Sequence, residues 1–290
     1  MINPIIFSFN IGSFVLALRW YGVLVMTGVA VAAWIASREI TRRGENGEAL
    51  WDMLIWVLPA GIIGARLWYV VNAIYGGNSF YLQNPIKIFA IWEGGLHIYG
   101  GFVLGVLAMY FYLRQHKMDM WLFLDAIAPM TLLGQAIARP ANFINQELYG
   151  PPTNLPWGIP IDAAHRLAAY ADLVQFPVET TRFHPVFAYE MIWNFLAVGL
   201  IVYVAHRYAN KMKPGTEFFS WLVFAGLGRF LIEFLRPDQP LVGGTWITTT
   251  QVATIIMMLV GLLMLAYRYG KLKLPLPPLP EKYRISGHID

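Results

Sequence analysis

Cysteine is missing from this chain of 290 residues, and charged residues are scarce. Without a thiol, the protein can form no disulfide, no thiolate metal site and no cysteine nucleophile of its own. Charged residues make up 13% of the chain, whereas soluble domains contain about 25%. Hydrophobic residues make up 57%, and the mean hydropathy is +0.51. This composition indicates a protein that crosses a membrane several times.

Several motifs are also missing, and each absence argues against a class of protein. Asp125 is the only aspartate well inside an apolar stretch, whereas an intramembrane aspartyl peptidase needs two facing aspartates; we expect Asp125 to be a topological or helix-capping residue. The sequence has no Gly-x-Ser-Gly nucleophile of a rhomboid-type protease and no paired helical aspartates of a metal-dependent lipid phosphotransferase. The formal net charge of +4 is too small to suggest nucleic acid as a partner. We expect neither a metal nor a cofactor.

Seven apolar stretches are long enough to span a hydrocarbon core about 30 Å thick, which takes about 20 residues of helix. They cover residues 19–37, 51–74, 96–113, 121–139, 186–206, 217–235 and 247–268. We therefore predict an all-α integral membrane protein with seven transmembrane helices. Residues 1–18 and 80–92, which are apolar and contain proline, are expected to lie at the membrane interface. Pro59 and Gly61 are expected to interrupt the second stretch.

The uneven distribution of Lys and Arg among the connections sets the expected orientation. Thirteen of them lie in the tail and in three loops on one side, and six lie on the other side. Positively charged loops stay in the cytoplasm, so the N-terminus is predicted outside and the C-terminus inside. Four parts follow: an interfacial segment with helices 1 to 4 (1–139), a small extracytoplasmic head (140–185), helices 5 to 7 (186–268) and a cytoplasmic tail (269–290). The proline-rich tail is expected to be a stiff extension rather than a polyproline ligand.

Polar residues within the apolar stretches converge on one level in this topology, near the outer leaflet. They are Tyr21, His97, Tyr99, Arg139, Asn142, Asn145, Glu190, Arg229, Glu233 and Arg236. Guanidinium groups match the oxygens of a phosphate, asparagines can bond to ester or glycerol oxygens, and a tyrosine or histidine can transfer a proton. The set predicts a phospholipid-headgroup site. Its confinement to one leaflet argues against a transport path, which needs polar groups at the membrane midplane.

Some of these residues also have a purely structural explanation. Arg229 and Glu233 are four residues apart and can neutralise each other on one helical face. Tyr21 and His97 can lie at the interface as anchors. Arg66 is expected to be structural, either reaching outward or bonding to a helix end.

The most specific motif is Arg139-x-x-Asn142-Phe143-Ile144-Asn145-x-Glu147-x-x-Gly150. It resembles the signature of the bacterial prolipoprotein diacylglyceryl transferase family. Further segments resemble the family in the same order along nearly the whole chain: Arg19-Trp20-Tyr21-Gly22, Gly64-Ala65-Arg66, Trp92-Glu93-Gly94-Gly95 with Tyr99-Gly100-Gly101, Arg182-Phe183-His184-Pro185 with Tyr189-Glu190, and Gly228-Arg229 with Glu233 and Arg236.

This resemblance implies a multi-pass enzyme of the bacterial cytoplasmic (inner) membrane. Its reaction would move the diacylglyceryl group of phosphatidylglycerol to the lipobox cysteine of a prolipoprotein signal peptide, forming a thioether and releasing glycerol phosphate in the first step of lipoprotein maturation. The lack of cysteine agrees with this, since the thiol belongs to the substrate. A non-catalytic membrane protein that binds lipid or lipoprotein and a lipid transporter are the alternatives.

The resemblance also implies roles for individual residues. Arg139 and Arg229 would hold the phosphate and stabilise the departing glycerol phosphate. The other predicted substrate-binding residues are Tyr21, Asn142, Asn145, Glu147, Gly150, Glu190, Glu233 and Arg236. Pro140 disfavours an α conformation at Arg139, so the fourth helix is predicted to break there.

The group that takes the thiol proton stays open. Some family members have histidine directly before the glycine pair of the third helix, where this chain has Tyr99. His97 stands two residues earlier, and residues two apart on a helix point in different directions, so it is no automatic replacement. Three alternatives follow: Tyr99 as a positioning or proton-relay residue, His97, or no dedicated base. The third is possible because a thiol with a pKa of about 8.5 is partly ionised at neutral pH.

Overall fold

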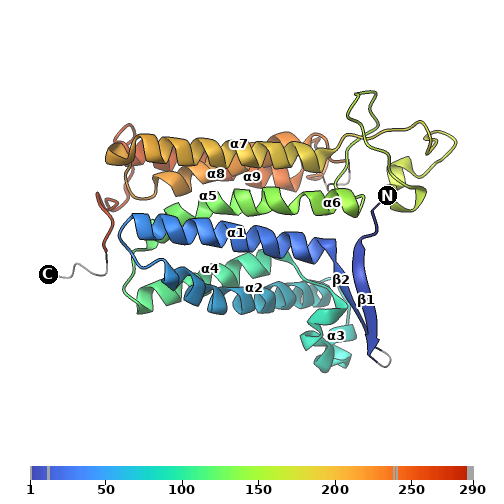
Figure 1. Cartoon of the computed structure of the whole chain (residues 1–290), viewed down its shortest axis with the longest axis horizontal. Helices are drawn as coiled ribbons and strands as arrows, with labels where there is room; N and C mark the ends of the chain where they lie inside the picture. The colour runs from blue at the N-terminus through green and yellow to red at the C-terminus, as the bar shows by residue number, and fades with distance from the viewer. Residues whose placement is uncertain (1, 12–13, 238, 240, 286–290) are drawn as a thin grey trace. The chain divides into compact units, whose positions relative to one another are not determined.

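The computed structural model describes residues 2–11, 14–237, 239 and 241–285. Two compact units make up the chain and are described separately. The first comprises Met1–Ile35 and Leu124–Lys282, and the second comprises Ala36–Phe123 and Tyr283–Asp290. Helices dominate the secondary structure (Figure 1).

All seven predicted helices form close to their expected positions. They are α1 (Trp20–Arg42), α2 (Glu48–Tyr75), α4 (Ile98–Gln115), α5 (Met120–Ala138), α7 (Val186–Arg207), α8 (Thr216–Glu233) and α9 (Thr249–Arg268). Among the described residues, five helical segments are long and apolar enough to cross a membrane: α1, α2, α7, α9, and α5 taken together with the short α6 (Pro140–Ile144). The chain is therefore a multi-pass membrane protein. The helices α4 and α8 are not among the five, so a total of seven spans stays a prediction.

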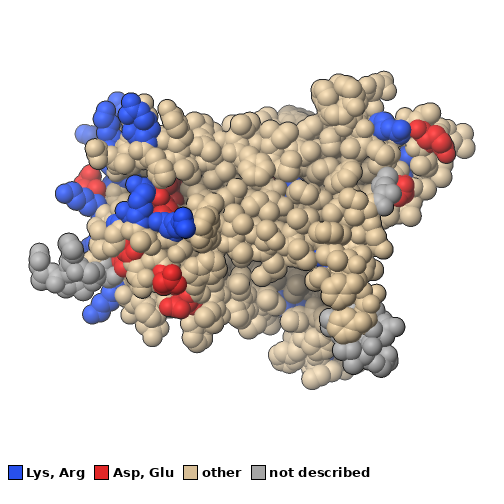
Figure 2. Space-filling view, viewed as in Figure 1, with Lys and Arg blue, Asp and Glu red and all other residues tan. Residues whose placement is uncertain are grey.

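Large apolar side chains remain exposed along these helices. On α2, Ile55 and Trp56 expose 67% and 66% of their surface. A water-facing surface rarely keeps a wide apolar patch, whereas lipid tails cover such side chains in a bilayer. Charge gathers instead at helix ends: Figure 2 shows a group of Lys and Arg where α7 ends at Arg207, and few charged side chains in the middle of the visible face.

The N-terminal segment forms a hairpin, which adds two strands to a chain that is otherwise helical. β1 (Ile5–Ile11) pairs antiparallel with β2 (Phe14–Arg19), with Ile5 opposite Arg19 and Ile11 opposite Phe14. The sequence does alternate between apolar and polar residues from Phe7 to Ile11, which is the pattern of a strand. The prediction treated the segment as uniformly apolar and missed this.

In the first unit, three helices pack side by side in the order α7, α8, α9 (Figure 1). Gly228 on α8 makes room for Trp193 on α7, because a Cβ at Gly228 would lie 2.1 Å from the indole nitrogen. That nitrogen donates a hydrogen bond to the carbonyl of Phe224 at 2.9 Å. Elsewhere in this unit, Gly28 on α1 and Gly134 on α5 allow their two helices to touch, since a Cβ at Gly28 would lie 2.5 Å from the carbonyl oxygen of Gly134.

In the second unit, α2 and α4 pack through glycines. A Cβ at Gly100 would lie 2.1 Å from the carbonyl oxygen of Gly64, and one at Gly64 would lie 2.3 Å from that of Gly100. Small residues of this kind let helix backbones approach closely in membranes. The expected interruption of the second apolar stretch is wrong, because α2 continues through Pro59.

Replacing Gly100 by alanine should therefore destabilise the protein. The added methyl group forces α2 and α4 apart, and overpacking of this kind costs about 1–3 kcal/mol. Gly199 on α7 is the matched control, because nothing lies within 4 Å of a Cβ built there; Gly199→Ala should be neutral or slightly stabilising, since alanine favours helix. Thermal unfolding of both variants in the same detergent measures the difference, and equal midpoints would contradict the glycine contact.

Arg66 is structural, as predicted. Between α2 and α4 the chain forms α3 (Phe80–Gln83) and the 3-10 helices η1 (Pro85–Phe89) and η2 (Ile91–Glu93). The Arg66 side chain is buried and donates to four carbonyl oxygens of this segment, at 2.6 to 3.2 Å, in Lys87, Ile88, Gly94 and Gly95. Gly94 and Gly95 have φ values of 82° and 70°, which glycine adopts without strain.

The segment 145–185 folds around a small core of its own in the first unit. Tyr149, Ile161 and Phe183 are its buried residues. Arg166 lies over the Phe183 ring at 4.6 Å and donates to the carbonyl of Ile161 at 2.8 Å. The secondary structure described in this segment is limited to isolated bridges at Phe183 and to the 3-10 helices η3 (Ala163–His165) and η4 (Ala168–Tyr170). The segment thus has a compact core, and its described strand pairing is limited to single bridges.

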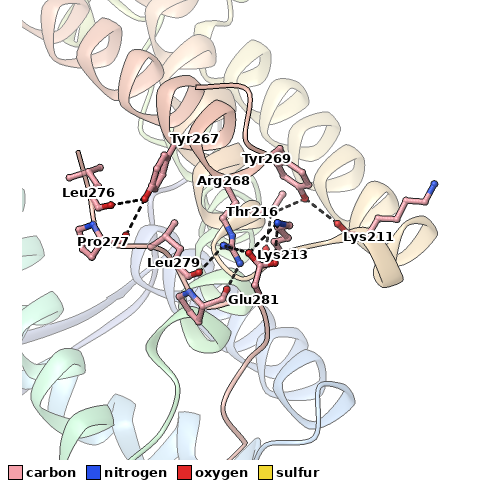
Figure 3. A network of polar contacts seen from close by, with 11 residues as sticks. Lys211, Lys213, Thr216, Tyr267, Arg268, Tyr269, Leu276, Pro277, Leu279 and Glu281 are labelled. Carbon is pink, nitrogen blue, oxygen red and sulfur yellow. Dashed lines mark hydrogen bonds and ion pairs between the residues drawn. The ribbon is translucent and has the colours of Figure 1, made fainter. Parts of the chain in front are cut away.

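The tail folds back onto the end of α9 in the first unit and is not a free extension there. Tyr267 and Arg268 donate hydrogen bonds to four tail carbonyls (Figure 3), those of Leu276, Pro277, Leu279 and Pro280. Lys213, just after the 3-10 helix η5 (Ala209–Lys211), forms an ion pair with Glu281 at 3.0 Å. The hydrogen bond from Lys213 lowers the pKa of Glu281, so this contact is present at neutral pH and is lost as the pH falls through that lowered pKa.

Candidate functional site

Helix α5 ends at Ala138 and α6 begins at Pro140, so the helix is interrupted at Arg139 as predicted, although the Arg139 backbone itself keeps an α conformation. The Arg139 backbone has φ −58° and ψ −32°, and its N–H donates to the carbonyl of Gln135 at 3.1 Å. Pro140 occupies the first position of α6, where a missing N–H is tolerated. Arg139 and Asn142 are consequently neighbours on one helical face, three residues apart.

Arg139 begins a continuous line of polar contacts in the first unit. Its guanidinium forms an ion pair with Glu190 in the first turns of α7 and donates to Oδ1 of Asn142 at 3.3 Å. The Asn142 amide donates to Oε1 of Glu147 at 2.9 Å, and the Asn145 amide donates to the same oxygen at 3.2 Å. Five of the predicted site residues are therefore in contact with one another.

Arg229 has a carboxylate partner on its own helix, α8. The ion pair joins Nη2 of Arg229 to Oε2 of Glu233 at 2.9 Å, and the Glu233 side chain is completely buried. The hydroxyl of Thr248, just before α9, donates to the other carboxylate oxygen at 2.9 Å. The contact of Thr248 with Glu233 was not predicted from the sequence, although Thr-x-x-Gln before an apolar stretch is the pattern of a capping box.

Arg139 and Arg229 belong to one charged group, whose other members are Glu190, Glu233 and Arg236. The charges that act on the Arg229 guanidinium are those of Arg236, Glu233, Glu190 and Arg139. Arg139 and Arg229 are each paired with one carboxylate of this group, that of Glu190 and that of Glu233. The side chains of Arg139 and Arg229 are 20% and 26% exposed, so both remain open to an anion. The Nε of Arg139 is buried and has no hydrogen-bond partner among the described residues.

Gly150 and Tyr21 lie outside this line of contacts. The N–H of Gly150 donates to the carbonyl of His184 at 2.8 Å, and a Cβ at Gly150 would lie 2.9 Å from the carbonyl oxygen of Leu235. Close backbone packing is therefore sufficient reason for a glycine here. Tyr21, in the first turn of α1, exposes 46% of its surface. Contacts of either residue with a substrate stay predictions.

His97 and Tyr99 belong to the second unit, where they start α4. Their ring centroids lie 5.1 Å apart. The expectation that the two side chains point in different directions is wrong, because His97 precedes the helix and has an extended backbone (φ −113°, ψ 121°). Nδ1 of His97 is buried and has no hydrogen-bond partner among the described residues, whereas Tyr99 is 60% exposed. The pair therefore combines a buried imidazole nitrogen with an exposed tyrosine side chain.

Comparison with known proteins links this arrangement to one family. The protein-family model described as prolipoprotein diacylglyceryl transferase matches residues 4–267. The chain belongs to this family. The match includes every residue of the charged group and ends before the tail.

Individual relatives extend the family match over most of the chain. The phosphatidylglycerol–prolipoprotein diacylglyceryl transferase of Halalkalibacterium halodurans is 37% identical over 272 residues, which cover 93% of this chain and 89% of the relative. The protein of the same name from Chloroflexus aggregans is 36% identical over 266 residues, covering 88% of this chain and 86% of the relative. That from Enterococcus faecalis is 36% identical over 250 residues, covering 86% of both chains. This member of the prolipoprotein diacylglyceryl transferase family thus matches its relatives at nearly full length.

Proposed function

We propose that the protein transfers the diacylglyceryl group of phosphatidylglycerol to the cysteine thiol of a prolipoprotein. Family membership supports this, and so does the absence of a cysteine from the enzyme itself. In the proposed reaction, the sulfur attacks the carbon of the diacylglyceryl group that is bonded to the phosphate oxygen. A C–S bond forms, the C–O bond to the phosphate breaks, and glycerol phosphate leaves. The thiol proton passes to a base or to the leaving phosphate.

The observation that best supports this chemistry is that two partly exposed guanidinium groups, those of Arg139 and Arg229, belong to the same charged group. A phosphodiester carries one negative charge, and the departing phosphate monoester gains a second as the bond breaks. Guanidinium groups placed beside that oxygen interact more strongly with the transition state than with the ground state, which is the condition for catalysis. Glu190 and Glu233 hold the two arginines in place, and both guanidinium groups stay partly exposed and can reach a phosphate.

We further propose the orientation and location that the sequence predicts. The chain would cross the bacterial cytoplasmic (inner) membrane seven times, with its N-terminus outside and its C-terminus inside. The head at 140–185 would face outward and the tail at 269–290 would face the cytoplasm. The excess of Lys and Arg in the connections on one side supports this orientation. The charged group would then lie near the outer leaflet, where it can take phosphatidylglycerol from among the membrane lipids and where a lipobox cysteine emerges.

Reconstitution into lipid vesicles tests the proposal directly. Purified protein would be supplied with vesicles that contain phosphatidylglycerol and with a peptide that carries a lipobox cysteine, and mass spectrometry would detect the peptide with the added diacylglyceryl group. A peptide with serine in place of that cysteine and vesicles of phosphatidylcholine alone are the controls. Binding of lipid and peptide without transfer would favour the non-catalytic alternative, and movement of labelled lipid between leaflets without transfer would favour a transporter.

The proton-handling pair can be separated by pH. We expect Tyr99→Phe to slow transfer by about tenfold to a hundredfold at neutral pH, since it removes the hydroxyl but keeps the ring. The loss should shrink above the pKa of the peptide thiol, about 8.5, because the thiolate then forms without help. His97→Ala should have the smaller effect, and rates would be compared from pH 6 to pH 9. Full activity of both variants at every pH would exclude a base at either position.

A further inference from the structure

Thr248 contacts Glu233, the carboxylate that pairs with Arg229, although Thr248 lies at the start of another helix. It is the residue that precedes α9, and 6% of its surface is exposed. Its hydroxyl donates to Oε1 of Glu233 at 2.9 Å, while Oε2 of the same carboxylate faces Arg229. The two carboxylate oxygens of Glu233 thus have different partners.

The direction of the Thr248 hydroxyl is fixed by a second residue. The backbone N–H of Gln251 donates to the hydroxyl oxygen at 3.0 Å, and the backbone N–H of Thr248 donates to Oε1 of the Gln251 side chain at 3.0 Å. This reciprocal pair is a capping box. Because the hydroxyl oxygen accepts from Gln251, its hydrogen remains for Glu233. The start of α9 therefore presents one oriented donor to a completely buried carboxylate.

Without the Thr248 hydroxyl, Oε1 of the buried Glu233 carboxylate would lose its hydrogen-bond donor. That oxygen would then turn toward the Arg229 guanidinium, which lies 2.9 Å from the other carboxylate oxygen. Carboxylate and guanidinium can pair through two parallel hydrogen bonds, and such a pair would withdraw the guanidinium from an incoming phosphate.

We infer that Thr248 is a positioning residue for Arg229. By holding Oε1 of Glu233, it limits the carboxylate to a single contact with the guanidinium and leaves the remaining N–H groups of Arg229 to the substrate. The inference rests on the proposed function, since it takes the phosphate of phosphatidylglycerol as that substrate. The oriented hydroxyl acts through Glu233 and does not touch the lipid.

Steady-state kinetics of Thr248→Val and Thr248→Ser test the inference. Valine keeps the shape but has no hydroxyl, so the KM for phosphatidylglycerol should rise about tenfold, as expected for the loss of a hydrogen bond to a charged group. The KM for the lipobox peptide should stay unchanged. Serine keeps the hydroxyl and should restore most of the affinity for phosphatidylglycerol.

Gln251→Met is the matched control, because Thr248→Val also weakens the cap of α9. Methionine removes the side-chain half of the capping box but leaves the backbone N–H of Gln251 and the hydroxyl of Thr248. It should lower the thermal midpoint without raising the KM for phosphatidylglycerol. A KM that rises equally in Gln251→Met and Thr248→Val would assign the effect to helix stability and overturn the inference.

The remaining outcomes separate this inference from the proposed function. An unchanged KM for phosphatidylglycerol in an active Thr248→Val variant would overturn the role of Thr248 alone. A wild-type protein that transfers nothing from phosphatidylglycerol to the peptide would overturn the proposed function itself.

Discussion

Replacing Arg139 by alanine should lower the rate of diacylglyceryl transfer by at least about a hundredfold, which corresponds to about 2.7 kcal/mol. Removal of one donor that stabilises a developing oxyanion typically has an effect of this size. Arg139 presents a partly exposed guanidinium beside Glu190 and Asn142. The departing phosphate gains its second charge next to this group, so the loss should fall on kcat as well as on binding. Quantifying the lipidated peptide over time with saturating phosphatidylglycerol measures it.

A control must separate chemistry from stability, because Arg139 also neutralises Glu190. The Glu190 side chain is only 10% exposed, and a buried charge that loses its partner destabilises a protein by about 3–5 kcal/mol. The double variant Arg139→Ala with Glu190→Gln removes both charges, so it should recover most of the thermal stability and none of the activity. Recovery of activity in the double variant would show that Arg139 serves the fold and not the lipid.

Two further variants sharpen the assignment. Arg139→Lys keeps the charge but not the planar fork that matches two phosphate oxygens, and it should fall between wild type and alanine. Arg229→Ala should resemble Arg139→Ala, since both arginines belong to one charged group. If Arg139→Ala and Arg229→Ala both kept full activity, neither arginine would hold the phosphate.

The long helices could be predicted because the bilayer imposes their length and composition. Each predicted stretch begins and ends within a few residues of a helix, as in 186–206 against Val186–Arg207. The hairpin from Ile5 to Arg19 was missed because a short apolar segment near a membrane has no such constraint. Its alternation of apolar and polar residues disappears when hydropathy is averaged over a long window.

Local rules gave only part of the backbone geometry at two positions. Pro140 disfavours an α conformation at the residue before it, and the helix is interrupted at Arg139, yet Arg139 keeps α angles and its guanidinium pairs with Glu190 on α7, 51 residues away. Helical spacing separated His97 from Tyr99, yet their rings meet because the helix starts after His97. The Glu190 partner of Arg139 could not be identified from positions close in the sequence, since it lies 51 residues away.

The polar residues of the charged group were predictable as a set, but their pairing was not. Costly intramembrane charges stand out in an apolar sequence, which singled out Arg139, Glu190, Arg229 and Glu233. The i,i+4 pair of Arg229 and Glu233 could be predicted from spacing. The bond from Thr248 to Glu233 depends on how α8 and α9 pack, and spacing contains no information on that packing.

Asp125 has an architectural role, as the sequence suggested, and caps a helix other than its own. This aspartate on α5 is fully buried, and its carboxylate accepts hydrogen bonds from the N–H groups of Gly215 and Phe218 at 2.5 and 2.7 Å. These are the N-cap and third positions of α8, the two donors that a capping box satisfies. Gly215 has no side chain to do so itself, and its φ of 89° explains why glycine is used there.

Asp125→Ala should therefore destabilise the protein by about 3 kcal/mol or more, since it leaves two buried N–H groups without their charged acceptor. Asp125→Asn should cost less, because one amide oxygen can still accept one of the two bonds. Asp119 provides the comparison: its Oδ1 accepts from the N–H groups of Trp121 and Leu122 at the start of its own helix, and its Oδ2 accepts from the N–H of Arg284. Asp119→Ala should therefore cost about 1 kcal/mol for the cap and about 1 kcal/mol for the bond to Arg284. Inactivation half-lives at elevated temperature would rank the three variants. Equal half-lives for Asp125→Ala and Asp119→Ala would mean that the start of α8 finds other acceptors, whereas the expected order would show that α8, the helix that carries Arg229, depends on an acid from α5 for its first turn.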